Sequence, residues 1–584
     1  MKFKNKKEII TISTILIIQT IIFIFAGINK SYIHMDEAYS LGLSNYDKLN
    51  LQENNDFYNT WHTKEYYEDY LSVNENEKYN FLPVYENQKN DVHPPLYYLL
   101  LRIAMGFNLD NYSKWPGLIV NIIIYVFITL FIYLIIKKLL KGTEKCNEKA
   151  AILALISSIT LSSINNAIYI RMYALSTLNI VITTYLHLKL LDEKNNNYKL
   201  LFGIGLSALI GSLTHYYYLF YLAMLFIMFV IKYIKEKRYN ELGKYICTLV
   251  IAGAVSLIIF PYSIQHMFFG YRGHGAIANL TNISEFFKNI VLYLLVINVY
   301  GFNNILFFLL IFMLVIIIYK KLKKIQLIDT KSKYINYILF PTLFYSVLVA
   351  LSSPWIELRY IMPVCSLLFI IVFYFLIMLL KNVFNKRNTN TIIIIIFLLI
   401  FIMPILSNKV IDLVIGKDFR NEQETSYSSK KDIVDKLKIE SNIPIDIMSY
   451  FSNAPLDNIL LYIKDFKLEP DVLFSNKKNI VEVLKNDLNN VPALYLFNSD
   501  NNRFLDDILL FTNIDESYIA KDIDCNKENI NKILDNKDTS NGILVFINDG
   551  QENEKLIEII KNSSNLYDVT YLKRLNACDI YYIK

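Results

Sequence analysis

The chain has 584 residues, of which 54% are hydrophobic, and its formal net charge at pH 7 is +6. So apolar a composition excludes an ordinary soluble protein of this length, and so small a charge gives no sign of nucleic-acid binding. The five cysteines include no CxxC pair, which argues against a disulfide framework and a structural zinc site. The sequence therefore predicts a multi-pass protein of the cell membrane.

The first apolar run, residues 9–26, follows a basic leader at residues 2–7. The run is long for a cleaved signal peptide and lacks a good cleavage site, so we expect a retained helix. The positive-inside rule places the leader in the cytoplasm, and residues 31–95 then form the first external loop. The rule thus assigns the N-terminus to the cytoplasm.

Apolar segments then recur along the chain with short polar turns between them. Residues 96–107 and 286–300 are read as helices lying at the interface, and we expect Tyr97, Tyr98 and Arg102 in the headgroup layer. Residues 263–285 are predicted to be a polar external loop. Every strongly basic loop between spans falls on one side, as expected for cytoplasmic loops. About eleven spans are predicted, at residues 9–26, 116–136, 150–164, 174–191, 200–213, 217–231, 245–262, 303–319, 335–351, 361–380 and 392–405.

Beyond residue 408 the composition becomes that of a globular domain. Helical patterns alternate there with short β-like runs, which predicts a soluble α/β domain over residues 409–584, outside the cytoplasm. The helical patterns are at 430–439 and 480–488, and the β-like runs are at 445–448, 493–497, 543–547 and 579–583. The predicted fold is therefore mostly α, with a polytopic transmembrane domain over residues 1–408 and this C-terminal domain.

The first external loop begins with an acidic pair, Asp36 and Glu37, directly after the first apolar run. An acidic pair is ordinarily solvated, but ionisable groups kept at a membrane face are functional by default. Partial desolvation at a helix end raises the pKa of a carboxyl and makes it a better base. Inverting sugar transfer needs such a base to deprotonate the acceptor hydroxyl.

The same loop closes with His93 before two prolines, which fix the backbone and the direction of the imidazole. A lone histidine is usually structural. This one could instead hydrogen-bond a phosphate, orient the acid pair or ligate a metal.

Cationic and aromatic side chains gather at the other predicted external turns. An arginine fork suits phosphate, whereas snorkelling and an aromatic belt are the ordinary alternatives. Several cations converging on one outer face would neutralise a departing phosphate. The candidates are Arg171, Tyr173, His215, Arg272, Arg359 and Tyr360.

Four motifs together resemble the dolichyl-phosphate-mannose protein mannosyltransferase-like (family 39) membrane glycosyltransferases, which have the GT-C fold. They are the acidic pair at 36–37, His-Pro-Pro-Leu-Tyr at 93–97, Arg-x-Tyr at 171–173 and Arg-Tyr-x-x-Pro at 359–363. The resemblance covers roughly residues 7–407 and implies a polyprenyl-phosphate sugar donor, reaction outside the cytoplasm, and inversion. It also implies that Asp36 holds the catalytic acidic position, with Glu37 beside it. The matching positions His93, Tyr97, Arg171, Tyr173 and Arg359 are then substrate-binding candidates.

The resemblance leaves the acceptor open, because the C-terminal domain lies outside the shared part. A protein, a lipid and a cell-surface glycan all remain acceptor candidates. Use of a divalent metal ion varies across this fold and is also left open. The sugar that is transferred is not indicated by any motif.

Two other classes of function were compared with the transferase. A transporter or flippase of lipid-linked glycans would account for the helices, but it predicts ionisable groups within spans or inverted repeats. Here the charges lie at one predicted face, and no internal repeat is visible. A sensor working through its soluble tail is the third class, but that tail carries no nucleotide-binding loop. The transferase is therefore the leading prediction.

Overall fold

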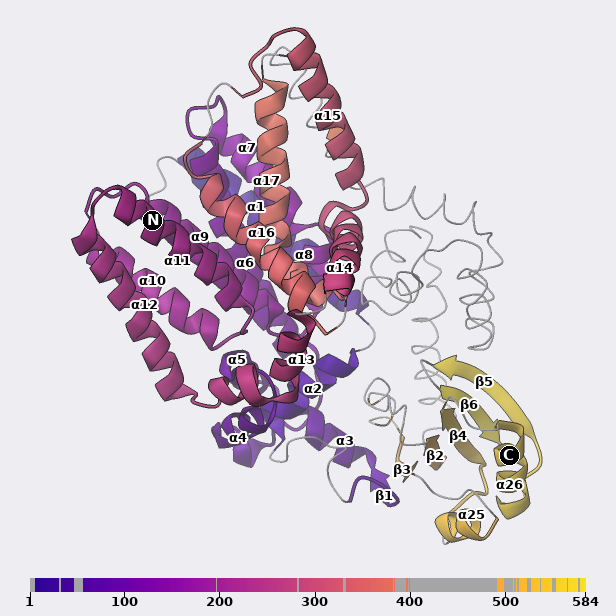
Figure 1. Cartoon of the computed structure of the whole chain (residues 1–584). Helices are drawn as coiled ribbons and strands as arrows, with labels where there is room; N and C mark the ends of the chain where they lie inside the picture. Colours follow the sequence, from indigo (N-terminus) through magenta and orange to yellow (C-terminus); the bar gives the residue numbers. More distant parts are fainter. Residues whose placement is uncertain are drawn as a thin grey trace.

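The computed structural model describes two main parts of the chain, a helical N-terminal part and a C-terminal sheet with two helices (Figure 1). The described residues are 6–30, 33–46, 56–195, 197–280, 283–328, 332–354, 356–381, 383, 395, 396, 399, 491–497, 508, 511, 514–521, 527–535, 537–548, 553–564, 566–575 and 578–584.

The helical part confirms the predicted mostly α class. Up to residue 190 its elements are α1 (Lys6–Asn29), α2 (Met35–Asn45), α3 (Lys64–Leu71), η2 (Glu75–Glu77), α4 (Leu82–Asn90), α5 (Leu96–Met105), α6 (Trp115–Leu139), α7 (Cys146–Ser158), α8 (Leu161–Ile168) and α9 (Tyr173–Leu190). Beyond residue 190 they are α10 (Tyr198–Ser212), α11 (Tyr218–Lys235), α12 (Tyr239–Ile259), η3 (Gln265–Phe269), α13 (Tyr271–Leu280), α14 (Ile283–Val296), η4 (Ile297–Gly301), α15 (Leu306–Leu322), α16 (Asn336–Ser352) and α17 (Leu358–Leu380).

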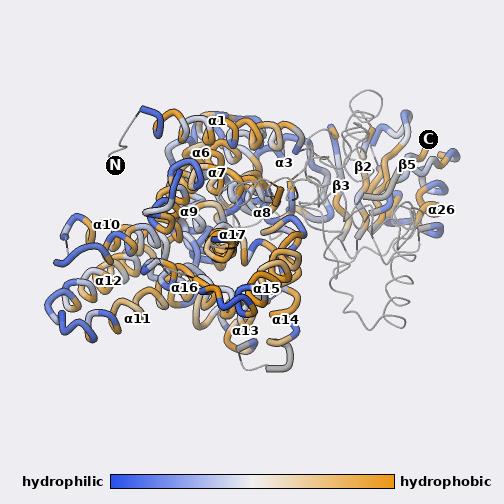
Figure 2. The backbone as a smooth tube through the Cα atoms, turned by 90° about the horizontal axis from the view of Figure 1, so that it is seen from above, coloured by the Kyte–Doolittle hydropathy of each residue, from blue (hydrophilic) through white to orange (hydrophobic). Residues whose placement is uncertain are grey.

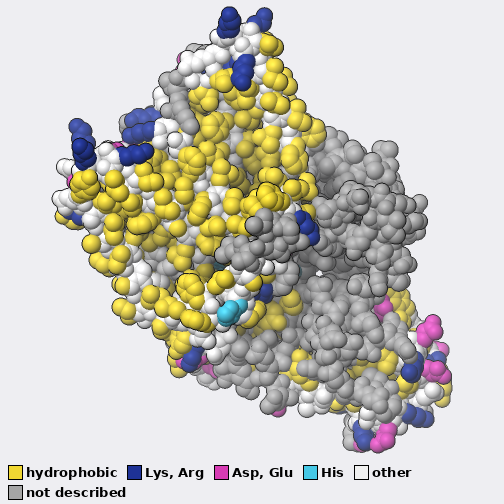
Figure 3. All heavy atoms as spheres, in the orientation of Figure 1, with side chains coloured by type: hydrophobic (Ala, Val, Ile, Leu, Met, Phe, Trp, Pro, Cys, Tyr) yellow, Lys and Arg dark blue, Asp and Glu magenta, His cyan; other side chains and the backbone are white. Residues whose placement is uncertain are grey.

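The helices pack into a bundle with α6, α9 and α17 inside it. In α17, 83% of the helix's most apolar stretch is buried inside the protein, whereas in α12 only 17% of the corresponding stretch is buried. Outward-facing side chains such as Ile17 and Ile251 are large and apolar, which suits contact with lipid rather than water. Figure 2 shows hydrophobic stretches along the helices and hydrophilic residues at many turns. In Figure 3 the hydrophobic surface of the bundle ends in Lys and Arg side chains at the top.

Within the described residues, five helices are long and apolar enough to cross a membrane, namely α1, α6, α11, α12 and α17. Two bent pairs, α7 with α8 and α14–η4 with α15, would raise the number to seven. Three shorter apolar helices, α5, α10 and α16, accompany them. These helices confirm a multi-pass membrane protein, while the number of about eleven spans stays a prediction. The last predicted span, 392–405, lies almost wholly outside the described residues.

The single span predicted at 150–164 is wrong in one respect, because the chain bends by 61° between α7 and α8. Thr160 caps α8 by accepting a hydrogen bond from the Ser163 N–H at 3.4 Å. Asn303 Oδ1 accepts from the N–H of Leu161 at 3.1 Å, so a distant turn also stabilises the break. Polar side chains thus start a new helix inside an apolar run.

Two further predictions of irregular or interfacial structure need correction. The loop predicted at 263–285 is largely helical, since η3 and α13 occupy most of it. The three side chains expected in the headgroup layer, Tyr97, Tyr98 and Arg102, are instead fully buried. Arg102 donates to the carbonyls of Asn45 at 2.7 Å and Ser44 at 3.3 Å, so it caps the C-terminus of α2.

The C-terminal part contains a six-stranded sheet in the order β1-β3-β2-β4-β6-β5. Its C-terminal strands are β2 (Ala493–Phe497), β3 (Glu516–Lys521), β4 (Ile543–Asn548), β5 (Val569–Leu575) and β6 (Cys578–Ile583), with helices α25 (Lys527–Leu534) and α26 (Asn553–Ser564). The strands predicted at 493–497, 543–547 and 579–583 are confirmed. The elements predicted at 430–439, 445–448 and 480–488, and the boundary at 408/409, lie outside the described residues.

The sixth strand, β1 (Trp61–Thr63), comes from the first loop rather than from the C-terminal part. It pairs antiparallel with β3 at the edge of the sheet. Because a paired sheet cannot be split across a bilayer, the first loop and the C-terminal sheet lie on the same side of the membrane.

Candidate active site

The N-terminus of α2 presents the acidic pair. His34 precedes this helix, and its Nδ1 accepts a hydrogen bond from the Asp36 N–H at 3.0 Å. In return, Glu37 Oε2 accepts from the His34 N–H at 2.9 Å, which completes a capping box. Carboxylates are stabilised at this end of a helix by its dipole. The local sequence therefore explains why both acids lie on the first turn.

Glu37 is fully buried, and both of its carboxylate oxygens are occupied. Besides the His34 N–H, Oε2 accepts from Lys30 Nζ at 2.8 Å. Oε1 accepts from the N–H of Ile170 at 2.7 Å. Glu37 thus joins α2 to the end of α1 and to the turn between α8 and α9. This arrangement suits a residue that positions its neighbour.

The Asp36 side chain is 15% exposed. It bonds to a different set of partners from those of Glu37. The Tyr169 hydroxyl donates to its Oδ2 at 3.0 Å. Arg359 forms an ion pair with the same oxygen, and Arg171 Nη2 lies 4.0 Å from Oδ1. A partly exposed carboxylate is therefore held by two cations and a phenol from the α8–α9 turn and from α17.

The two arginines are themselves oriented by neighbours. Arg171 donates from Nη1 to Ser40 Oγ at 3.0 Å and to the Tyr98 hydroxyl at 3.3 Å. Arg359 also forms an ion pair with Glu357, which directly precedes α17. Fixed guanidinium groups on one side of a carboxylate make a site that attracts a second anion.

Beside this group, His93 and His215 lie with their ring centroids 6.3 Å apart. His93 Nδ1 is 2.8 Å from Asp91 Oδ2, which favours a neutral ring with its proton on Nδ1 and an acceptor at Nε2. Burial lowers the pKa of His93 against the opposing charge of Asp91, and Arg171 lowers it further. Burial, aided by His93 and Arg171, lowers the pKa of His215 to about 3.

Asp91 remains the anion of this pair. Burial opposes its charge, yet His93 and Arg171 together hold the pKa of the Asp91 carboxyl below its usual range. At neutral pH the cluster therefore contains two neutral imidazoles and one carboxylate.

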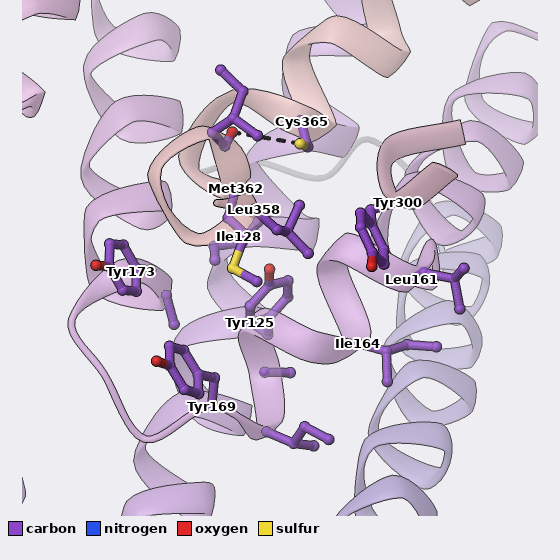
Figure 4. Close-up of a cluster of buried hydrophobic side chains, with 14 of the residues drawn as sticks. Tyr125, Ile128, Leu161, Ile164, Tyr169, Tyr173, Tyr300, Leu358, Met362 and Cys365 are labelled. Carbon is purple, nitrogen blue, oxygen red and sulfur yellow. Dashed lines mark hydrogen bonds between the residues drawn. The ribbon is translucent and has the colours of Figure 1, made fainter. Parts of the chain in front are cut away.

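Aromatic rings continue from His215 towards α17. The Tyr173 ring centroid lies 5.5 Å from that of His215 and 6.5 Å from that of Tyr360. Tyr217 lies 5.1 Å from His215 and 5.9 Å from Tyr360. In Figure 4, Tyr169 and Tyr173 point their hydroxyls the same way, out of the apolar cluster behind them. These rings form a continuous aromatic row between His215 and the start of α17.

Tyr97 and Arg272, both predicted to bind substrate, contact residues other than Asp36. The Tyr97 hydroxyl donates to Asn121 Oδ1 at 3.2 Å, and Asn121 Nδ2 donates to the carbonyl of Tyr169 at 2.6 Å. Tyr97 therefore supports the turn that carries Tyr169. Arg272, on α13, lies with its guanidinium 5.0 Å from the centroid of the Tyr271 ring. Its positive charge still contributes to lowering the pKa of His93.

Sequence reasoning left four residues of this site out of the candidate set. Tyr169 and Asp91 are each two residues from a predicted site residue, so their position in the motif was the available signal. Glu357 is likewise two residues from Arg359. Lys30 directly follows the first helix and is only seven residues from Glu37, but nothing in the sequence shows that their side chains meet.

Metal binding was left open by the sequence. Among the residues that the structure describes, no group of three or more His, Cys, Asp or Glu side chains could hold a metal ion.

Comparison with known proteins gives a family match over part of the chain and a similar fold over nearly all of it. Residues 92–263 match the model of the dolichyl-phosphate-mannose-protein mannosyltransferase family, a segment that contains His93, Arg171 and His215. No curated protein matches the sequence.

Two solved structures are similar over 98% of this chain and 97% of theirs, each at 8% sequence identity. They are ArnT from Cupriavidus metallidurans in the apo state, with a TM-score of 0.50, and the same protein bound to undecaprenyl phosphate, with a TM-score of 0.49. The family match over residues 92–263 and the fold shared with ArnT agree with the resemblance seen in the motifs to the dolichyl-phosphate-mannose protein mannosyltransferases.

Proposed function

We propose that this protein transfers a sugar from a polyprenyl-phosphate donor to an acceptor hydroxyl at the outer face of the membrane, with inversion. Asp36 is the general base. The observation that carries the proposal is the meeting of Asp36 with Arg171, Arg359 and Tyr169, which the fold brings together from three separate elements. The family match supports a lipid-phosphate sugar as donor.

The charges at the site fit a phosphate. Arg171 and Arg359 bring two positive charges next to the carboxylate of Asp36, and Arg359 is shared with Glu357. A donor phosphate would compete with Asp36 for these arginines and would release that carboxylate from its strongest ion pair. The freed carboxylate regains basicity at the moment when the donor is bound. Binding of the donor and activation of the base are thus coupled.

The reaction balances without an additional reagent. The acceptor oxygen forms a bond to the anomeric carbon as its proton passes to Asp36. The bond between the anomeric carbon and the phosphate oxygen breaks, and its electron pair leaves with the phosphate. The added negative charge on the phosphate is stabilised by Arg171 and Arg359. Attack from the face opposite the leaving group inverts the anomeric centre.

Glu37 has a supporting role in this proposal. Its carboxylate is closed off by Lys30, His34 and Ile170, so it has no free oxygen for the acceptor. It holds the first turn of α2 and therefore the direction of Asp36.

The orientation of the chain follows the charge of its turns. The turn around Lys237 and the lysines at the end of α15 belong to the basic loops predicted to be cytoplasmic. Single cysteines at Glu65 and Lys237, both exposed, test this directly. An impermeant thiol reagent outside cells should label the first and spare the second. Labelling of Lys237→Cys alone would reverse the proposed topology.

The reaction is tested with purified protein and a panel of polyprenyl-phosphate sugars, by measuring release of polyprenyl phosphate. Asp36→Asn should lower the rate by about 10²–10⁴-fold, the usual contribution of a general base. The matched control is Glu86→Gln, since Glu86 lies on α4 of the same loop and contacts Lys89 at the surface. Full activity in folded Asp36→Asn would refute the role of Asp36. A flippase would release no polyprenyl phosphate at all.

A further inference from the structure

We propose that the C-terminal sheet acts as a brace for the catalytic loop and fixes the position of Asp36 through β1 and α3. This inference rests on the proposed function of Asp36 and assigns a role to the C-terminal domain, a part of the chain that the family match does not cover.

The first loop and the C-terminal sheet are joined by the pairing of β1 with β3, which has a defined register. Trp61 is opposite Tyr518, His62 opposite Ser517 and Thr63 opposite Glu516. A three-residue strand has little stability by itself, so side chains must hold it in place. The Trp61 indole N–H donates to the carbonyl of Ile533 at 2.9 Å, and Lys537 Nζ lies 4.5 Å from the centre of the indole ring.

The contacts continue into α3, which directly follows β1. Tyr67 and Ser517 are fully buried, and their hydroxyl oxygens are 2.7 Å apart. Lys64 Nζ is 3.0 Å from Asp515 Oδ1. This second pair is well exposed, so it contributes little energy compared with the buried hydrogen bond. Both pairs nevertheless join the first turn of α3 to β3 or to the residue just before it.

From α3 the contact passes to α2, the helix that carries Asp36. Gly42 of α2 lies against the ring of Tyr70, so closely that a Cβ at this position would be 1.9 Å from Tyr70 Cζ. Asn45 Nδ2 donates to the carbonyl of Leu71 at 3.3 Å. A shift of α3 must therefore move α2 as well, because close-packed surfaces transmit displacement.

Other elements also support α2: α4 and α5 pack against it, and two side chains act at its ends. Glu37 holds its N-terminus, and Arg102 caps its C-terminus. Among the described residues, α3 packs against α2 and also directly follows β1, so it joins this helix to the sheet. Without β1, the edge of β3 would be open and α3 would lose its outer anchor. The brace thus helps to hold Asp36 in place. Precise placement matters because a small displacement of a catalytic group can lower the reaction rate strongly.

Trp61→Ala tests the brace, with two readouts. We expect the rate at saturating substrates to fall at least tenfold with little change in donor KM, because positioning of the base is lost while the arginines remain. Hydrogen exchange of the amides of α2 should become faster. Tyr79→Ala is the matched control, since Tyr79 belongs to the same loop and is 80% exposed. It should leave both readouts unchanged.

A disulfide supplies the rescue. Thr63→Cys and Glu516→Cys place two thiols at directly opposed positions of β1 and β3 and leave the Tyr67–Ser517 hydrogen bond intact. In the Trp61→Ala background, oxidation should restore both the rate and the protection of α2, and reduction should remove them again. Unchanged rate and exchange in Trp61→Ala, or a crosslink that forms without rescue, would overturn the brace. If exchange behaves as expected while the wild-type protein transfers no sugar, the proposed function fails and the brace stands.

Discussion

Tyr169 donates a hydrogen bond from its hydroxyl to Asp36 Oδ2 at 3.0 Å, although 133 residues separate them in the sequence. The same hydroxyl is 3.4 Å from His34 Nδ1. Tyr169 belongs to the turn between α8 and α9, and Asn121 of α6 holds the carbonyl of this residue. The position of the proposed base therefore depends on helices distant from it in sequence.

Tyr169→Phe should lower the transfer rate about tenfold, because a hydrogen bond to a charged group contributes about 1.5–3 kcal/mol and water replaces part of it. The ring remains, so folding should be unaffected. Initial rates and thermal unfolding in detergent measure the two effects. Tyr79→Phe, on the exposed part of the first loop, is the control. A loss of folding with no specific loss of rate would contradict this role of the hydroxyl.

The buried pair of Lys30 and Glu37 gives a prediction on stability. Lys30→Met leaves the Glu37 carboxylate buried without its cation and should destabilise the protein by about 3–5 kcal/mol. The double variant Lys30→Met with Glu37→Met should regain part of this loss, since no charge is then stranded. Thermal unfolding of the four proteins of this cycle measures the coupling. Additive effects of the two substitutions would show that the pair is not coupled.

Gly117→Ala should displace the turn that carries Ile170 and Arg171. A Cβ at Gly117 would be 2.6 Å from Cγ2 of Ile170, and the other close atoms also belong to that side chain. We expect lower activity in Gly117→Ala and partial recovery when Ile170→Ala removes those atoms. Gly253→Ala on α12 meets nothing within 4 Å and serves as control. Activity assays on the single and double variants decide the matter, and failure of the second change to restore activity would count against displacement.

The pH dependence should reflect His93. Burial lowers the pKa of His93, so the neutral ring persists below the ordinary value of about 6.5. If the neutral ring is the active form, activity is present above this lowered pKa and is lost as the pH falls through it. The acid limb of the rate profile should thus lie below about pH 6.5, the ordinary pKa of histidine.

Asp91→Asn tests whether the acid limb belongs to His93, by the direction in which the limb moves. The charge of Asp91 raises the pKa of His93, so its removal should move the acid limb to still lower pH. His93→Gln should abolish that limb. Rates between pH 4.5 and 8, measured alongside unfolding at each pH, distinguish titration from denaturation. A limb that moves upward in Asp91→Asn would exclude His93 as its source.

Local pattern determined much of this protein. Long apolar runs between polar turns were sufficient for the multi-pass helical class, because a helix must satisfy its backbone in lipid. The motif residues Asp36, His93, Arg171 and Arg359 indicated the chemistry proposed for the site, since their types and order favour it. The strand at 493–497 was also visible as a short run of apolar and aromatic residues.

Tertiary structure alone decided the different surroundings of the two acids of the pair. Adjacent carboxylates look equivalent in sequence, but one turn of helix directs Glu37 into an ion pair with Lys30 and Asp36 towards Arg171 and Arg359. The strand at Trp61–Thr63 was equally invisible, since three residues form a strand only when a partner edge is present. Side-chain partners hundreds of residues apart leave no local signal, because only the folded chain brings their atoms within bonding distance.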